Sequence, residues 1–215
     1  MSFTLTPGAE LKMMRLFSSP HAPNPRRVRI FLAEKSVSVR VVDIDLAADQ
    51  HRSTDYSAIN PLQRTPALQL DDGEIITETV AICRYIEHLH PDPVLFGSPG
   101  LESARVEMWQ RRVELNLFMH IANAYRHAHP GAKTLEIPQI AAVAEASRPK
   151  ALEFMGFLDR ELAARAFIAG PFSIADITGL VALDFLRPAR IDMPEGLHNL
   201  RRWHNDLRTR PSAKA

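Results

Sequence analysis

Cysteine is almost absent from this chain, whose 215 residues include one, Cys83. One cysteine excludes an internal disulfide, a CxxC redox pair and a metal site built from several thiolates. Cys83 lies in an apolar helical pattern beside Ile82 and Tyr85, which is typical of a buried and inert thiol. Any thiol chemistry must therefore use a thiol borrowed from another molecule.

The sequence also lacks net charge and long apolar runs. Lys+Arg 26 against Asp+Glu 25 leaves a formal charge of +1, so no global field attracts the protein to nucleic acid or to an anionic membrane. No apolar run approaches the roughly 20 residues of a membrane helix, and the first residues lack the basic-then-apolar order of a secretory signal. We therefore expect a cytoplasmic protein that binds neither nucleic acid nor membrane.

What remains is ordinary globular composition, with 46% hydrophobic and 24% charged residues, enough for one or two domains with a real core. Residues 1–12 show no apolar period and contain Pro7-Gly8, so we expect a loose leader. Residues 13–90 then predict the order βαβ followed by ββα, which is typical of a thioredoxin-like α/β domain. The predicted elements are a strand at Met14–Phe17, a helix at Pro25–Glu34, a strand at Val39–Ile44, a short helix, a hairpin and a helix from Glu78.

The second half of the chain predicts only helices. Residues 91–100 are rich in proline and glycine and indicate a linker, and residues 101–215 form the predicted helical domain. Ser173 to Asp176 forms a capping box that opens a mostly apolar helix, which should be buried. The other predicted helices run over Leu101–His127, over Pro138–Ala146, from Ser147-Arg148-Pro149 through Leu162, and across Leu197, Leu200, Trp203 and Leu207.

The most informative feature is Thr65-Pro66 followed by Glu78-Thr79. The intervening residues alternate as two strands around the turn at Asp71-Asp72-Gly73, so both pairs should face one pocket. A helix that starts near Glu78 offers free backbone N–H groups, a positive dipole end and the Thr79 hydroxyl, which can together receive a small carboxylate. The alternative is that Thr79 only caps a helix and Pro66 only starts a strand.

This segment resembles the glutathione site of the glutathione S-transferase family, and the domain order resembles bacterial theta-like and nu-like members over residues 13–214. The resemblance implies a thioredoxin-like N-terminal domain followed by an all-α domain. It also implies that Thr65 offers its backbone to the cysteinyl part of glutathione across a cis bond. Glu78 and Thr79 would hold the γ-glutamyl end.

The same resemblance extends to the glycyl end of glutathione. Asp49-Gln50-His51 is similar to a theta-class segment whose histidine binds the glycyl carboxylate, which makes His51 the candidate. Arg64 could offer a charged donor to the same carboxylate. Alternatively, His51 is a solvated loop histidine and Arg64 a surface residue. Gln63 stands where glycine is common in the family, which puts the loop conformation in question.

The first loop, residues 18–30, departs from the serine-type family pattern. The hydroxyl that contacts the glutathione sulfur in those members corresponds to Ala22, which cannot donate a hydrogen bond. In nu-class-like members a Pro-Asn pair similar to Pro23-Asn24 supplies this contact, so we favour Asn24 as the catalytic residue. Asn before Pro25 is also an ordinary helix N-cap, and the two roles are compatible. His21 is the second candidate, or it lines a second-substrate pocket together with Ala22.

The reaction needs a thiolate, because a free thiol ionises near pH 8.5 and only a few per cent is nucleophilic at neutral pH. An amide N–H, the N-terminus of the helix from Pro25 and nearby arginines can stabilise the anion.

The electrophile should lie along the long helix after the linker, where several side chains follow helical spacing on one face. Core or dimer packing is the alternative explanation of this stripe. His120, His127 and His129 lack a carboxylate or cysteine at matching spacing, so we expect no metal site. The predicted pocket residues on this helix are Met108, Arg112, Asn116 and His120, with Leu115 and Met119 on the same stripe.

Together these features predict a homodimeric, cytosolic, glutathione-dependent transferase. Glutathione would be the cosubstrate, and its thiolate would attack a small electrophile or reduce a disulfide or peroxide. One alternative is a glutathione-binding, weakly catalytic or regulatory protein, which Ala22 motivates. Another is a thioredoxin-like scaffold that does not bind glutathione, which conflicts with the combination of Thr65, Glu78 and Thr79.

Overall fold

The computed structural model describes residues 11–215, which divide into two compact units, one ending at Pro93 and the other running from Val94 to Lys214. Each unit is described by itself below. Residues 1–10 of the predicted leader lie outside the described residues. Its last two residues, 11 and 12, belong to strand β1, which begins at Leu11. No described helix is both long and apolar enough to span a bilayer.

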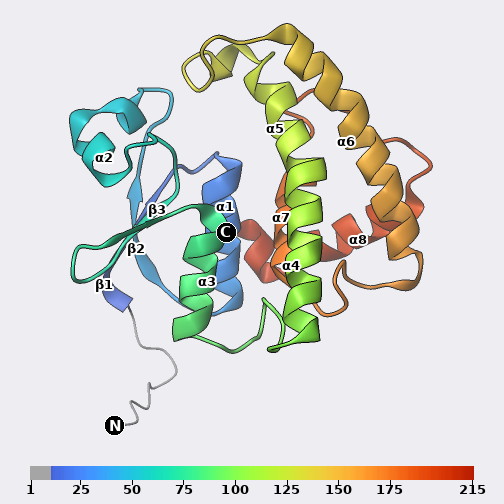
Figure 1. Cartoon of the computed structure of the whole chain (residues 1–215), viewed down its shortest axis with the longest axis horizontal. Helices are drawn as coiled ribbons and strands as arrows, with labels where there is room; N and C mark the ends of the chain where they lie inside the picture. Colours follow the sequence, from blue (N-terminus) through green and yellow to red (C-terminus); the bar gives the residue numbers. More distant parts are fainter. Residues whose placement is uncertain (1–10) are drawn as a thin grey trace. The chain divides into compact units, whose positions relative to one another are not determined.

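The first unit is built on a four-stranded mixed sheet with the strand order β2-β1-β3-β4 (Figure 1). Strands β1 and β2 are parallel, whereas β1 pairs antiparallel with β3 and β3 antiparallel with β4. The turn between β3 and β4 contains Gly73 at φ 91, a conformation that glycine adopts without strain. The strands are β1 (Leu11–Ser18), β2 (Val39–Asp43), β3 (Ala67–Gln69) and β4 (Ile75–Thr77).

Helices cover both faces of this sheet (Figure 1). Helices α1 (Pro23–Glu34) and α3 (Thr79–Leu89) pack against each other on one face. On the other face, α2 (Thr54–Ile59) follows a 3-10 turn at Gln50–Arg52. Its Tyr56 joins Phe17, Ile44 and Ala67 in a buried cluster. The βαβ and ββα order therefore confirms the predicted thioredoxin-like architecture.

The second unit contains only helices among its described elements, as predicted, but the first of them is not one uninterrupted α-helix. Helix α4 (Leu101–Val113) passes into a π-helical turn at Glu114–Phe118 and continues as α5 (Met119–Arg126). A π turn inserts one extra residue per turn and so shifts the faces of the two flanking segments relative to each other. The predicted helix Leu101–His127 therefore has nearly the observed length, but the prediction of one regular α-helix was wrong, because a π-helical turn interrupts it.

The prediction of two helices around Pro149 was wrong. The chain forms a single helix, α6 (Ala141–Glu161), with Pro149 inside it. Ser147, the predicted cap, is instead buried on the packed face with Ala144 and Ala151. Proline removes one backbone hydrogen bond from a helix interior, and the packing of this face offsets that loss.

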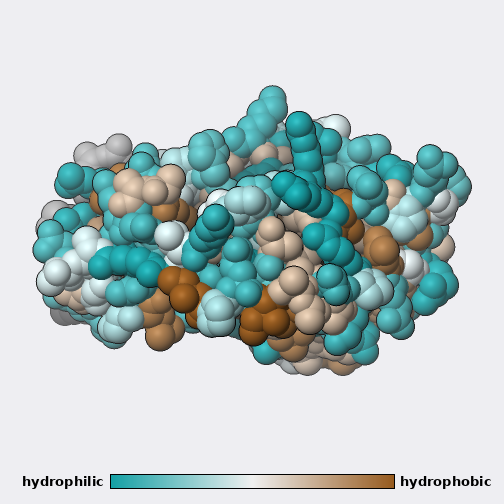
Figure 2. Space-filling view, turned by 90° about the horizontal axis from the view of Figure 1, so that it is seen from above, coloured by the Kyte–Doolittle hydropathy of each residue, from teal (hydrophilic) through white to brown (hydrophobic). Residues whose placement is uncertain are grey.

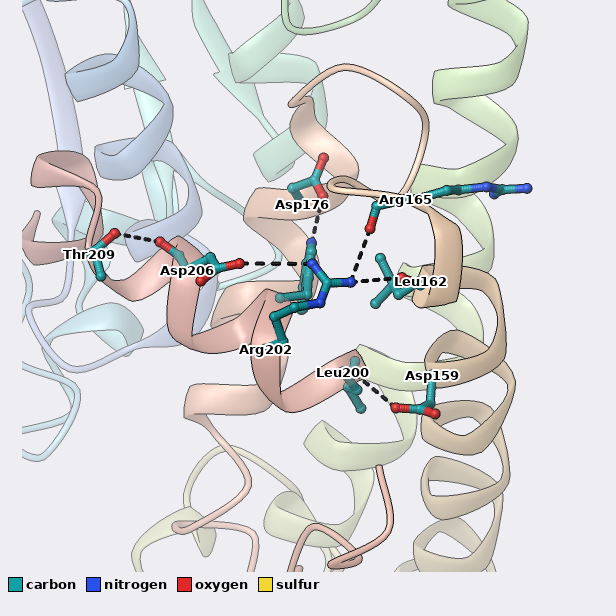
Figure 3. A network of polar contacts seen from close by, with 9 residues as sticks. Asp159, Leu162, Arg165, Asp176, Leu200, Arg202, Asp206 and Thr209 are labelled. Carbon is teal, nitrogen blue, oxygen red and sulfur yellow. Dashed lines mark hydrogen bonds and ion pairs between the residues drawn. The ribbon is translucent and has the colours of Figure 1, made fainter. Parts of the chain in front are cut away.

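Helix α7 (Ile174–Asp184) is the buried centre of the second unit, and α8 (His198–Arg208) packs against it. Ser173 and Asp176 form the predicted capping box at its start. The fully buried carboxylate of Asp176, which Figure 3 labels, accepts three hydrogen bonds. The donors are the Ser173 and Ile168 amides, at 3.0 and 2.9 Å, and Trp203 Nε1, at 3.0 Å. One carboxylate therefore joins the start of α7, the preceding loop and α8. The remaining short 3-10 helices are Pro130–Ala132, Leu162–Ala164 and Pro211–Lys214.

Helix α7 has no room for a side chain at Gly179, where an added Cβ would lie 2.7 Å from Trp203 Cη2. We expect Gly179→Ala to lower the free energy of unfolding by about 1–3 kcal/mol through overpacking. Gly156→Ala in α6 is the matched control, because its Cβ would meet only Arg160 Nη1 at 3.8 Å. The control should gain about 0.5–1 kcal/mol from helix propensity. Urea denaturation of both variants measures the contrast, and equal effects would contradict this packing account.

Candidate functional site

The strand register gathers the predicted site segments of the first unit at one edge of its sheet. Ala67 of β3 lies opposite both Phe17 of β1 and Thr77 of β4. The chain leaving β1 toward α1, the Thr65-Pro66 pair entering β3 and the Glu78-Thr79 pair leaving β4 therefore lie side by side. Strand β2 ends at the same edge, because it runs parallel to β1 with Asp43 opposite Ser18.

Thr79 is the first residue of α3, and its side chain is almost fully buried. Among the described residues, its hydroxyl has no hydrogen-bond partner, and the first turn of α3 contains no acidic side chain. The N-cap residue Glu78 is exposed and has φ 67, a conformation that costs a non-glycine residue about 1–3 kcal/mol. The result is a helix N-terminus with a free hydroxyl and positive dipole end, which suits a carboxylate.

The peptide bond between Thr65 and Pro66 is cis. Neither the N–H nor the C=O of Thr65 is bonded within the described part of the chain. This residue therefore presents a free donor and a free acceptor, the pair that an extended peptide needs for strand-like pairing.

Two buried side chains fix the approach to this cis bond. Tyr56 Oη and Asn60 Nδ2 each donate to the Arg64 carbonyl oxygen at 2.7 Å. Burial raises the pKa of Tyr56 to about 12, so its hydroxyl stays protonated and able to donate. Gln63 adopts φ 54, a left-handed conformation that glycine adopts without strain. The Arg64 side chain itself is exposed.

His51 lies in the 3-10 turn before α2 and is 1% exposed, not solvated as a loop histidine would be. Neither ring nitrogen has a hydrogen-bond partner among the described residues. Burial lowers the pKa of His51, since desolvation disfavours the charged form. The ring is therefore neutral at pH 7, with one N–H that a ligand could engage.

Helix α1 begins two residues earlier than predicted, and its N-cap is Ala22, without a side-chain cap. Asn24 therefore lies inside the first turn, and its predicted capping role was wrong. Pro23 and Pro25 carry no amide hydrogen, and the amides of Ala22 and Arg26 bond to the carbonyls of Ser19 and Ala22 at 3.2 and 3.3 Å. Among the described residues, the Asn24 N–H is the one unbonded backbone donor of this turn.

The side chain of Asn24 is held by an arginine one turn further along α1. Arg27 Nη1 donates to Asn24 Oδ1 at 3.2 Å, and Arg27 is 1% exposed. Because a guanidinium group only donates, the oxygen of the Asn24 amide must face Arg27. Its NH₂ group then points away from Arg27 and is available to an acceptor.

A second arginine fixes the loop between β1 and α1. Arg29 donates to Ser18 Oγ at 2.9 Å, to the Ser19 carbonyl at 3.3 Å and to the Pro20 carbonyl at 2.9 Å. Burial and the neighbouring charge of Arg26 lower the pKa of Arg29. His21, next in the chain, is exposed, and Ala22 is half-buried. The loop is thus anchored up to Pro20, and His21 reaches solvent.

In the second unit, the predicted stripe is exposed and does not belong to the core. Met108, Leu115 and Met119 are 40%, 38% and 44% exposed. The face drawn in Figure 2 is mostly hydrophilic, with a few separate hydrophobic patches. Arg112 is also exposed and lies over the Trp109 ring at 5.0 Å. Asn116 Nδ2 is engaged with the Arg112 carbonyl at 2.9 Å.

His120 is half-buried, and its Nδ1 has no partner within the described chain. Burial, together with the charge of Lys150, lowers the pKa of His120. A pocket of about 350 Å³ lies in this unit between the end of α7 and α8, and none of the predicted second-substrate residues lines it. Whether those residues contact a substrate therefore stays a prediction.

Cys83 is completely buried in α3, and burial raises the pKa of its thiol to about 12. It is therefore a neutral core residue. No cluster of three histidine, cysteine, aspartate or glutamate side chains suited to a metal occurs within residues 11–215.

Four supporting residues were not predicted individually from the sequence. Tyr56 and Asn60 stand at i, i+4 spacing before the cis bond, and Arg27 and Arg29 both lie in α1. Arg27 lies four residues before the buried Phe31, on the same face of α1. This spacing was the sequence signal that Arg27 is buried. Nothing in the sequence indicates that Arg29 turns back to Ser18.

Comparison with known proteins agrees with this architecture. Residues 12–88 match the family description "Glutathione S-transferase, N-terminal domain", and residues 117–211 match "Glutathione S-transferase, C-terminal domain". The chain is 37% identical to Glutathione S-transferase 2 of Saccharomyces cerevisiae over 212 residues, which cover 96% of this chain and 91% of that protein.

Solved structures are similar over nearly the whole chain. A glutathione S-transferase domain-containing protein of Marinobacter aquaeolei is 35% identical and superposes with a TM-score of 0.89 over 92% of this chain and 98% of its own. Gtt2 of Saccharomyces cerevisiae is 36% identical, with a TM-score of 0.87 over 93% of this chain and 98% of its own.

The first unit is thioredoxin-like, with a cis-proline immediately before β3, and the second unit is all-helical. This combination is the architecture of a class of two-domain enzymes. The chain belongs to the glutathione S-transferase family and is an enzyme of that family.

Proposed function

We propose that this enzyme binds glutathione along the sheet edge of the first unit and activates its thiol for attack on a small electrophile. The observation that carries the proposal is the register that places α1, Thr65-Pro66 and Glu78-Thr79 at one edge. The γ-glutamyl carboxylate then lies on Thr79 and the α3 N-terminus, beside Glu78. The cysteinyl backbone pairs with the free N–H and C=O of Thr65.

The glycyl end of glutathione falls to Arg64 and His51. Arg64 is exposed and supplies a charged donor to the glycyl carboxylate. His51 is neutral and already buried, and we assign its one ring N–H to the same end of glutathione as a donor. The unpartnered ring nitrogens of His51 support this assignment, since a buried polar group without a partner is unfavourable.

The sulfur of glutathione lies at the start of α1, within reach of Asn24. The Asn24 NH₂ group, its backbone N–H and the positive end of the helix stabilise the thiolate, while the proton leaves to solvent. The thiolate then forms a bond from sulfur to the electrophilic atom, and the leaving group departs with the bonding electrons. With a disulfide, the thiolate attacks one sulfur, the S–S bond breaks, and the other sulfur leaves as a thiolate. With a hydroperoxide, it attacks the terminal oxygen, the O–O bond breaks, and the remaining oxygen takes a proton and leaves as an alcohol, with a glutathione sulfenic acid formed that a second glutathione reduces to the disulfide and water.

For contact with the electrophile, the candidates in the second unit are Met108, Arg112, Asn116 and His120, and those in the first unit are His21 and Ala22. Met108 and its apolar neighbours on the stripe, Leu115 and Met119, suit an apolar electrophile. The enzyme acts in the cytoplasm without a metal ion, and small-molecule detoxification fits this reaction.

Thr79→Ala is expected to weaken glutathione binding about tenfold, because a hydrogen bond to a charged group contributes about 1.5–3 kcal/mol and the α3 amides still hold the carboxylate. Thr79→Ser keeps the hydroxyl and is the matched control, with affinity close to that of the wild type. Isothermal titration of glutathione into each protein measures the change. Unchanged affinity in Thr79→Ala would reject this placement of the γ-glutamyl end.

The side chain of Leu101 at the start of α4, which is 74% exposed, and the family membership support a homodimer. The helices beginning at Glu78 and Leu101 would contribute to a two-fold interface, which closes symmetrically. Light scattering at micromolar concentration is expected to give twice the mass of one chain. A monomer in that measurement would remove the dimer from the account.

One observation favours a second function, a glutathione-binding protein with little catalysis. Ala22 provides no hydroxyl at the sulfur, and the site depends on a neutral amide that cannot remove a proton. A panel of halonitroarenes, epoxides, hydroperoxides and disulfides separates the two functions. An enzyme turns over at least one class, whereas a binder retains glutathione affinity and turns over none.

A further inference from the structure

We propose that Arg27 is a positioning residue that fixes the Asn24 amide with its NH₂ group turned toward the glutathione sulfur. The proposal rests on the proposed function, in which Asn24 contacts the sulfur. Arg27 touches neither substrate nor reacting atoms in this arrangement. It acts through its 3.2 Å hydrogen bond to Asn24 Oδ1.

The chemical asymmetry of the two groups decides the orientation. An asparagine amide has a donor end and an acceptor end, and it can rotate to present either one. A carbonyl oxygen facing the sulfur would repel a thiolate, whereas the NH₂ group stabilises it. Guanidinium has donors only, so its presence at one end of the amide leaves the donor end for the sulfur.

Burial makes Arg27 effective in this role. The residue is 1% exposed, whereas Asn24 is half-buried at the helix start. Water therefore competes little for the guanidinium, and a charge-assisted hydrogen bond is stronger than a neutral one. The i, i+3 spacing within one turn of α1 also holds the two side chains in register.

The neighbouring arginine does not duplicate this function. Arg29 directs its donors to Ser18, Ser19 and Pro20 and so holds the loop rather than the amide. Arg27 could also lower the thiol pKa directly through its charge. A direct charge effect does not need Asn24, and this difference makes the two roles separable.

A double-mutant cycle tests the proposal with Asn24→Ala, Arg27→Met and the combined variant. The ultraviolet absorbance of the thiolate, followed against pH at saturating glutathione, gives the pKa of the bound thiol. We expect each single variant to raise this pKa by about 0.5–1, equivalent to a three- to tenfold loss of thiolate at a given pH. The combined variant should match Asn24→Ala, because Arg27 acts through Asn24.

Arg27→Lys provides a second variant should Arg27→Met fail to fold. Lysine keeps the charge and the donors but lacks the planar fork of the guanidinium. The thiol pKa of Arg27→Lys should therefore lie between that of the wild type and the higher value expected for Arg27→Met. Arg40→Met removes an exposed arginine from β2 and controls for a general charge effect, with no expected change in the thiol pKa. Thermal melts accompany every variant.

The outcomes separate this inference from the function on which it rests. If Asn24→Ala raises the thiol pKa and the Arg27 variants do not, Arg27 has no positioning role and the function of Asn24 stands. If Arg27→Met raises the pKa equally when Asn24→Ala is already present, the effect is direct charge and the inference is overturned. If Asn24→Ala leaves the pKa unchanged, the proposed role of Asn24 fails together with this inference.

Discussion

Asp176→Ala is expected to lower the free energy of unfolding of the helical unit by about 3–5 kcal/mol, the range that follows when several buried donors lose one acceptor. The variant leaves the amides of Ile168 and Ser173 and Trp203 Nε1 without their shared acceptor. Both tryptophans of the chain, Trp109 and Trp203, lie in this unit. Tryptophan fluorescence during urea denaturation therefore reports its unfolding.

Asp206→Ala is the matched control in the same region (Figure 3). The Asp206 side chain is 69% exposed and lies 3.9 Å from Arg202. Exposed ion pairs contribute less than about 1 kcal/mol, so this control should change little. Comparable losses in both variants would contradict the role of Asp176 as the centre of the network.

The stability contribution of Asp176 should also depend on pH. Burial outweighs the hydrogen bonds and raises the pKa of Asp176 from 3.8 to about 6. A raised pKa in the folded state means that the folded state binds the proton more tightly than the unfolded state. Protonation of Asp176 therefore stabilises the fold fully below about pH 4, and this stabilisation is lost as pH rises through about 6. Asp176→Asn does not titrate. The stability of the wild type relative to this variant should therefore fall between those pH values, and a constant difference would contradict the raised pKa.

Asn24→Ala is expected to lower turnover by about ten- to hundredfold while glutathione affinity changes little. This pattern marks an interaction that is stronger with the developing thiolate than with the bound thiol. Steady-state kinetics with an electrophile that the wild type accepts measures the effect.

Stability gives the control for the Asn24 experiment. Ala22 is the N-cap of α1, so Asn24→Ala removes no helix cap, but it takes one acceptor from the buried Arg27 guanidinium. A thermal melt should therefore show a loss of about 1–3 kcal/mol, which must be separated from the effect on turnover. If Asn24→Ala keeps full turnover and His21→Ala abolishes it, the histidine is the activating group and the assignment of Asn24 is wrong.

Local signals made much of the fold predictable. The turn at Asp71-Asp72-Gly73 and the alternating residues around it specify the hairpin through short-range chemistry. Ser173 and Asp176 specify the start of α7 through a capping box that needs four consecutive residues. In both cases the residues that determine the structure are those that form it, and the prediction was confirmed.

The errors came where packing overrides local preference. Pro149 reads as a helix boundary, yet the buried face of Ala144, Ser147 and Ala151 keeps α6 continuous. The π turn at Glu114–Phe118 has no marker in propensity, because it depends on how α4 and α5 pack.

In the candidate site, too, the residues joined by local sequence were predictable and those placed by tertiary packing were not. Thr65-Pro66 and Glu78-Thr79 could be placed together because a hairpin joins them in sequence. The bond from Arg27 to Asn24 could not be predicted, since it depends on where α1 begins and which way its arginines turn. The burial of His51 likewise follows from tertiary packing around α2 and has no local signal.

A crystal structure of the enzyme with glutathione tests the central claim most directly. The account predicts the γ-glutamyl carboxylate on Thr79, the cysteinyl backbone paired with Thr65, and the sulfur within about 3.5 Å of the Asn24 NH₂ group or its backbone N–H. A sulfur held by His21, or by any group other than Asn24, would contradict it.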